Sequence, residues 1–137
     1  MTYRLFDHTA DFGMEIFGKD LKDLFCNAQY ALFDQITELA SIKNENKKEI
    51  KVIGADLPDL MINWLRELLY LWNGKELLVN KTEVIYIKDN EMLAVVYYVS
   101  YDPDQHLIKK EIKAVTYHQI EVLKISSGYR ARVIFDL

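Results

Sequence analysis

The second half of the chain is a series of strand-like runs, and two pairs of them are joined by turns of two or three residues. Residues 82–88 and 129–135 alternate between two faces, residues 92–101 form an apolar and aromatic run, and residues 112–125 form another long strand. Asp89-Asn90 and Ser126-Ser127-Gly128 have the composition of turns. Because short turns favour hairpins, this half predicts an antiparallel sheet.

The first half contains two amphipathic helical patterns, each preceded by an aspartate that can cap a helix. Asp20 precedes a single apolar stripe, which fades near Thr37. Asp56 precedes the second pattern, Pro58 lies in its first turn, and Asn73-Gly74 predicts a left-handed stop. Further strands are predicted at residues 3–6, 13–18 and 49–54, and the polar residues 41–48 predict a loop.

The second helical pattern has an apolar arc wider than one stripe. Trp64 and Trp72 follow the helical period, and Ile62 and Leu69 widen the arc. We favour burial of this helix on more than one side, because exposed apolar patches of that size are uncommon in monomers. The alternative is a surface that meets a partner.

These patterns predict an α+β fold in which two helices pack on a curved, mostly antiparallel β-sheet that closes toward a barrel or sandwich. A chain of 137 residues fits one domain spanning residues 1–137. The single cysteine, Cys26, falls in a helical pattern and is predicted to be a small core residue in a reducing compartment.

Composition argues against several classes of protein. No apolar run reaches 18 residues and the N-terminal residues lack a signal-peptide pattern, so we expect a cytoplasmic protein without a membrane span. The net charge is −4, which disfavours tight direct binding of nucleic acid. The basic pairs Lys47-Lys48 and Lys109-Lys110 are interpreted as solvated strand ends. Common zinc, hydrolase and phosphate-loop motifs are missing.

The turn Asp7-His8-Thr9-Ala10-Asp11 concentrates ionisable groups between two apolar segments. Read locally, it fits an Asx turn, in which aspartate side chains accept from nearby main-chain N–H groups. It also fits a site for a hard cation with oxygen ligands.

The last strand ends in Asp136-Leu137, which brings a carboxylate next to the terminal carboxylate. If this strand runs beside one of the first two, Asp136 meets Asp11, and the two carboxylates repel unless a proton or a metal lies between them. Oxygen ligands favour calcium, magnesium or manganese over zinc. An additional imidazole ligand from His8 or His118 would make zinc a candidate as well.

The segment from Lys113 to His118 places Thr116 and His118 on one face of a strand. They are either hydrogen-bonded polar groups in a packed strand or residues that line a site. His118 is the best candidate for a base.

Four segments together resemble the archease family, in its order and spacing over essentially the whole chain. They are the turn 7–11 with the following strand to Gly18, the helical stretch 63–70, the strand 111–118 and the closing residues 133–137.

The resemblance implies a protein cofactor, not an enzyme, that activates an RtcB-type RNA ligase in tRNA splicing or RNA repair. Such proteins assist GTP-dependent guanylylation of a ligase histidine and support multiple turnover. It further implies a metal site, with Asp11, Asp136 and Leu137 as ligands and calcium as the expected ion. Lys113 matches a lysine close to that site, and Asp7, His8 and His118 match motif positions.

This chain departs from the family pattern at Tyr98-Val99-Ser100-Tyr101-Asp102, where members often carry a Gly-Glu-Pro-Phe-Asp-like segment and only the aspartate is retained. Two other functions remain open from the residues themselves. One is a stand-alone metal-dependent enzyme that uses Asp11 and Asp136. The other is a chaperone-like binding module that uses the helix around Trp64 and Trp72.

Overall fold

The structure is a computed structural model that describes residues 2–8, 11–43 and 46–137. Its elements, in chain order, are β1 (Tyr3–His8), β2 (Asp11–Gly18), α1 (Leu21–Ile36), a 3-10 turn (Leu39–Ser41), β3 (Asn46–Ile53), α2 (Leu57–Lys75), β4 (Leu77–Lys88), β5 (Glu91–Ser100), β6 (Ala114–Ile125) and β7 (Gly128–Asp136).

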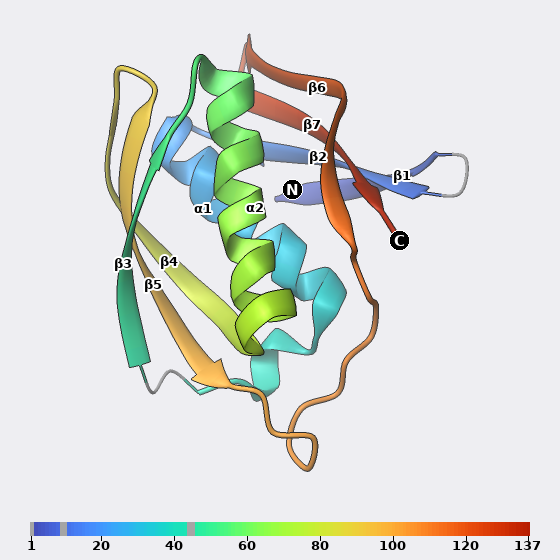
Figure 1. The fold of residues 1–137 in the computed structure, drawn as a ribbon. Helices are drawn as coiled ribbons and strands as arrows, with labels where there is room; N and C mark the ends of the chain where they lie inside the picture. The colour runs from blue at the N-terminus through green and yellow to red at the C-terminus, as the bar shows by residue number, and fades with distance from the viewer. Residues whose placement is uncertain (1, 9–10, 44–45) are drawn as a thin grey trace.

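The strands form two antiparallel sheets with the orders β1-β2-β7-β6 and β3-β5-β4. Figure 1 shows both helices between the two sheets, and α1 packs against β2 of one sheet and β4 of the other. The predicted α+β class is confirmed. The single curved sheet proves to be two open sheets, because helices that are apolar on more than one side need a sheet on each side.

The wide apolar arc of α2 is buried, which confirms the favoured interpretation. Ile62 and Trp64 are fully buried, Leu69 is 4% exposed and Trp72 is 9% exposed. Contacts of α2 with β3 and β4 on one side and β6 on the other explain why one stripe is not enough. The surface that the chaperone-like alternative required is therefore inside the core.

Both predicted N-terminal caps are present. The carboxylate of Asp20 accepts from the main-chain N–H of Asp23 at 2.8 Å, and that of Asp56 accepts from Asp59 N–H at 2.9 Å. The predicted stop at Asn73-Gly74 is wrong, since α2 continues to Lys75 and the left-handed residue is Glu76, with φ 54°. Gly74 instead makes room for a ring, because a Cβ there would lie 2.5 Å from Cε1 of Tyr70.

Tertiary pairing also moves other predicted boundaries. β3 begins at Asn46 inside the predicted loop, because Asn46, Lys47 and Lys48 pair with β5 despite their polarity.

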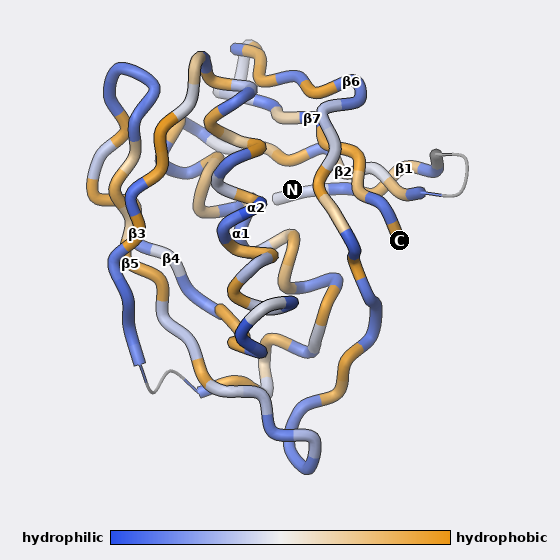
Figure 2. The backbone as a smooth tube through the Cα atoms, in the orientation of Figure 1, coloured by the Kyte–Doolittle hydropathy of each residue, from blue (hydrophilic) through white to orange (hydrophobic). Residues whose placement is uncertain are grey.

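The β4–β5 turn and the loop after Ser100 are hydrophilic, as Figure 2 shows. Within the described residues, no helix is long and apolar enough to cross a membrane.

Candidate functional site

Asp11 and Asp136 are register partners on the antiparallel strands β2 and β7. Partner residues of an antiparallel pair carry their side chains on the same face of the sheet, with Cβ atoms roughly 5 Å apart. The next residues on each strand, Phe12 and Phe135, are buried against the helices and stack with ring centroids 5.2 Å apart. Because side chains alternate along a strand, Asp11 and Asp136 lie on the outer face, away from the core.

Ion pairs on the same outer face help to fix this register. Glu15 is only 7% exposed and accepts from Arg4 Nε of β1 at 2.6 Å. Its other carboxylate oxygen lies 3.8 Å from Arg130 Nε of β7. A shift of β7 by one residue would turn Arg130 to the core face and break this link, so the pairing of Asp11 with Asp136 is strongly specified.

An aromatic ring lies on the outer face of the sheet, between these ion pairs and the two aspartates. Phe6 of β1 covers Gly13, where a Cβ would lie 2.0 Å from the tip of the ring. The guanidinium carbon of Arg132 is 3.9 Å from the Phe6 ring centroid, and Ile134 is 1% exposed although it belongs to this outer face. Gly13 is therefore required for the ring to lie flat beside the aspartates.

The structure brings some of the other candidate residues to the same end of the sheet. His8 is the main-chain register partner of Asp11. Lys113 donates its main-chain N–H to the carbonyl of Asp136 at 2.9 Å, and the exposed Leu137 follows Asp136 directly. Asp7 pairs with Phe12, so its side chain leaves β1 toward the opposite face from Asp11. Thr9, Ala10 and the side chain of His8 lie outside the described residues.

Thr116 and His118 do not share one environment. Thr116 is half-buried and its hydroxyl donates to the carbonyl of Ile134 at 3.0 Å, which fits the hydrogen-bonded interpretation. His118 is exposed and lies four residues beyond Ala114, the partner of Asp136. The pairing of β6 with β7 is interrupted after Thr116, and Gln119 has φ 53°.

The oxygen donors at the aspartate pair are of the type that a hard cation binds, but they are fewer than such an ion needs to fill its coordination sphere. Two carboxylates and a main-chain oxygen of Leu137 are the ligands that calcium or magnesium accepts, and no thiol is nearby in the sequence. Among residues 2–8, 11–43 and 46–137, no three His, Cys, Asp or Glu side chains are grouped to hold a metal. An ion bound there would fill its remaining positions with water and main-chain oxygens.

The whole chain matches a known family. Residues 3–137 fit the model of the Archease protein family (MTH1598/TM1083). The chain belongs to the archease family. Archease from Methanosarcina acetivorans is 36% identical over 139 residues, which cover 98% of this chain and 95% of that protein. Archease from Methanopyrus kandleri is 34% identical over 140 residues and covers both chains completely.

Solved structures show the same archease fold. The solution structure of Methanobacterium thermoautotrophicum protein 1598 has a TM-score of 0.81 and 30% identity, covering 99% of each chain. A crystal structure of an archease from Thermotoga maritima, described as a possible chaperone, has a TM-score of 0.65 and 21% identity, covering 96% of this chain and 94% of that one. This second likeness concerns the fold alone.

Lys110, interpreted from the sequence as part of a solvated strand end, makes specific contacts in the structure. Lys110 is not a solvated strand end, since its Nζ lies 4.3 Å from the Phe12 ring centroid and donates to Gln35 Oε1 at 3.1 Å. Gln35 donates in turn to the hydroxyl of Tyr3, which donates to Asp34. Burial, together with the neighbouring Asp34, raises the pKa of Tyr3 to about 12. The pair Lys109-Lys110 carries no local signal for these contacts, which are all between distant segments.

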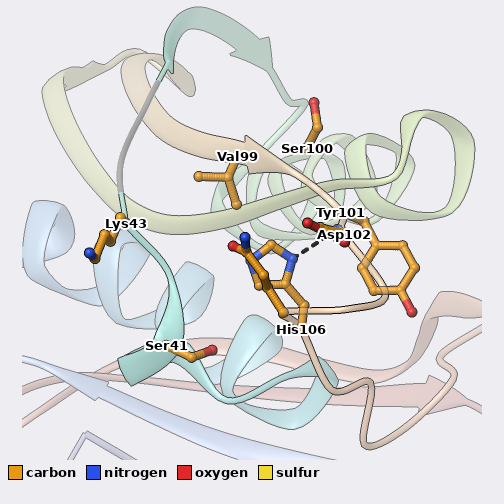
Figure 3. A pocket seen from close by; sticks show the side chains of 8 residues that line it. Ser41, Lys43, Val99, Ser100, Tyr101, Asp102 and His106 are labelled. Carbon is orange, nitrogen blue, oxygen red and sulfur yellow. Dashed lines mark hydrogen bonds between the residues drawn. The ribbon is translucent and has the colours of Figure 1, made fainter.

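The segment that departs from the archease pattern leads into a closed loop. Asp102 accepts from the main-chain N–H of Gln105 and His106, and its own N–H donates to His106 Nδ1 at 2.9 Å. His106 is 8% exposed and borders a cavity of about 390 Å³. Figure 3 shows the Lys43 amine and the Ser100 hydroxyl pointing away from the His106 ring, so these polar groups do not converge on one ligand. We interpret His106 as a structural residue that holds the loop closed through its hydrogen bond with Asp102.

Proposed function

We propose that this protein is a cofactor of an RtcB-type RNA ligase, acting in tRNA splicing or RNA repair by promoting GTP-dependent guanylylation and multiple turnover. The observation that carries the proposal is the pairing of Asp11 with Asp136 at one end of the outer sheet face, in a member of the archease family. In this proposal the protein has no catalytic site of its own and works in the cytoplasm.

Asp11, Asp136 and a main-chain oxygen of Leu137 would hold a divalent ion, calcium first, with magnesium, manganese and zinc left open. Bound there, the ion would supply positive charge toward phosphate oxygens. The two aspartates hold this charge at an exposed sheet end, where a partner can reach it. Lys113, joined to Asp136 through the main chain, would orient the approach of an anionic group.

Net charge supports a protein partner over free RNA. A chain of net charge −4 repels a phosphate backbone but suits the basic surface of an enzyme that binds RNA. Direct, tight binding of nucleic acid by this protein alone is therefore not part of the proposal.

The test is a multiple-turnover ligation assay with the RtcB-type ligase of the same organism and GTP. Asp11→Ala and Asp136→Ala are expected to lower the stimulation of turnover, while Asp104→Ala, an exposed loop carboxylate, leaves it unchanged. Full stimulation by both aspartate variants would contradict the proposal. Calorimetry should show modest calcium affinity, because few protein ligands hold the ion.

The rival of a stand-alone metal-dependent enzyme requires a base beside the aspartates. His118 is the sequence candidate, and it is exposed and lies beyond the β6 irregularity. Hydrolysis of a phosphoester by this protein in the absence of any ligase would favour the rival.

A further inference from the structure

A groove of about 310 Å³ separates α2 from the start of β6, two elements that run side by side in Figure 1. Its floor is apolar, since Leu69 is 4% exposed and Val115 is 3% exposed. Its lining consists of Arg66, Leu69, Tyr70, Asn73, Lys113, Ala114 and Val115. These residues include two cations, and none of them is acidic.

Arg66 is held in place before any partner arrives. Its guanidinium carbon lies 4.8 Å from the Tyr117 ring centroid, and one of its terminal nitrogens is 3.5 Å from the Tyr117 hydroxyl. That hydroxyl donates to Asp59 at 2.7 Å. Such positioning reduces the conformational entropy that Arg66 loses when it binds an anion.

Tyr70 is an exposed ring with a fixed position. It is 56% exposed, and it lies against Gly74, where a Cβ would be 2.5 Å from Cε1 of the ring. Lys75 places its Nζ 5.7 Å from the ring centroid. An ordered aromatic ring beside a positioned arginine is the composition of an interface hot spot.

The far end of the groove reaches the main chain of Asp136. Lys113 lines the groove and donates its main-chain N–H to the carbonyl of Asp136. Among the described residues no ion pair of Lys113 is found, so its charge is available. A segment lying in the groove would thus reach the strand end that carries Asp136, on the face of the sheet opposite the aspartate side chains.

The groove suits a protein segment better than a nucleic acid. Two cations neutralise only a few phosphates of a nucleic acid, which leaves little of the electrostatic affinity such binding needs. The apolar floor, in contrast, contributes binding free energy only when an apolar side chain of the partner covers it and removes it from water. Carboxylates on either side of such a side chain would meet Arg66 and Lys113.

We propose that the α2–β6 groove docks an acidic segment of a protein partner, with an apolar side chain on Leu69 and Val115 and carboxylates at Arg66 and Lys113. This inference rests on the proposed function in taking the ligase as the partner that carries the segment. It adds the docking surface, which the aspartate pair does not define.

A peptide titration tests the groove without the ligase. An acetylated, amidated peptide of alternating Glu and Leu is added to the full-length protein, and backbone amide shifts are followed by NMR. Shifts are expected at residues 66–73 and 113–115, and Arg66→Glu should weaken binding by about tenfold or more. Lys22→Glu, the same charge reversal on the exposed face of α1, is the matched control and should bind as wild type.

Shifts spread over the surface, or equal binding by both charge-reversal variants, would overturn the assignment. So would tighter binding of an oligouridylate at the same amides, which would make the groove a nucleic-acid site. In a second arm, Arg66→Glu and Tyr70→Ala should lower the affinity for the ligase while leaving calcium binding unchanged. If wild type fails to bind the ligase at all, the proposed function fails, and the peptide titration still decides the groove.

Discussion

Asp11 and Asp136 face each other across β2 and β7, although they lie near opposite ends of the sequence. Like charges placed directly opposite on a sheet repel each other, and a cation bound between them would relieve this repulsion. The neighbouring Phe12–Phe135 stack and the Glu15 ion pairs hold the two strands in register against this repulsion. Fold and candidate site are therefore set by the same strand pair.

Removing one of these carboxylates should affect stability and metal binding in opposite directions. In Asp136→Asn without metal, we expect unfolding free energy to stay the same or rise by about 0.2–1 kcal/mol, since repulsion is relieved. Calcium should raise the Tm of wild type but not of the variant, because only the native site binds the ion. Thermal unfolding with calcium or with a chelator measures both effects.

Asp104→Asn provides the control, because Asp104 is an exposed loop carboxylate outside both strands. It should keep the full calcium response. An equal calcium shift in Asp136→Asn and wild type would show that Asp136 does not hold the ion.

Gly13→Ala should destabilise the outer face next to the aspartates. The new Cβ would lie 2.0 Å from the tip of the Phe6 ring, which must leave its place over Gly13 and beside Arg132. Overpacking of this kind costs about 1–3 kcal/mol, measured by urea unfolding. Phe6→Ala removes the ring, so the double variant should lose less than the sum of the two single variants. Strict additivity would mean that the two positions do not interact.

Tyr3 should make stability depend on pH at the alkaline end. Burial and Asp34 raise its pKa from 10.0 to about 12, so the folded protein holds the phenol proton more tightly than the unfolded chain does. This stabilisation is complete below pH 10 and is lost as the pH rises through about 12.

Absorbance titration of the native protein at 295 nm measures the effect. Tyr3→Phe should remove the tyrosine that ionises last, and Asp34→Asn should shift that step toward lower pH. An unchanged titration curve near pH 12 in Tyr3→Phe would contradict the assignment.

His106→Leu should loosen the loop that follows β5. The variant keeps an apolar side chain but loses the acceptor for the main-chain N–H of Asp102. An unpaired, partly buried donor costs about 1–3 kcal/mol in unfolding free energy. Leu107→Ala, whose side chain is 66% exposed, is the matched control and should change stability by less than about 0.5 kcal/mol. Equal stability of His106→Leu and wild type would show that this bond is dispensable.

Local rules were enough to predict the elements that depend on neighbouring residues. The caps at Asp20 and Asp56 and the period of each helix are encoded within a few positions, and the structure confirms them. The predicted end of the second helix at Asn73-Gly74 is wrong. Gly74 leaves room for the Tyr70 ring, and turn composition does not reveal that contact. The early start of β3 at Asn46 likewise depends on pairing with a distant strand.

For the candidate site, the sequence by itself identified two acidic side chains, Asp11 in a turn between two predicted strands and Asp136 at the end of the last strand. Long-range strand pairing makes β2 and β7 neighbours, in a register that places these two residues opposite each other. Only the tertiary structure decided that Lys110 packs on Phe12 and that Arg66 and Lys113 share a groove. Strand order and long-range packing depend on burial summed over the whole core, which no local pattern contains.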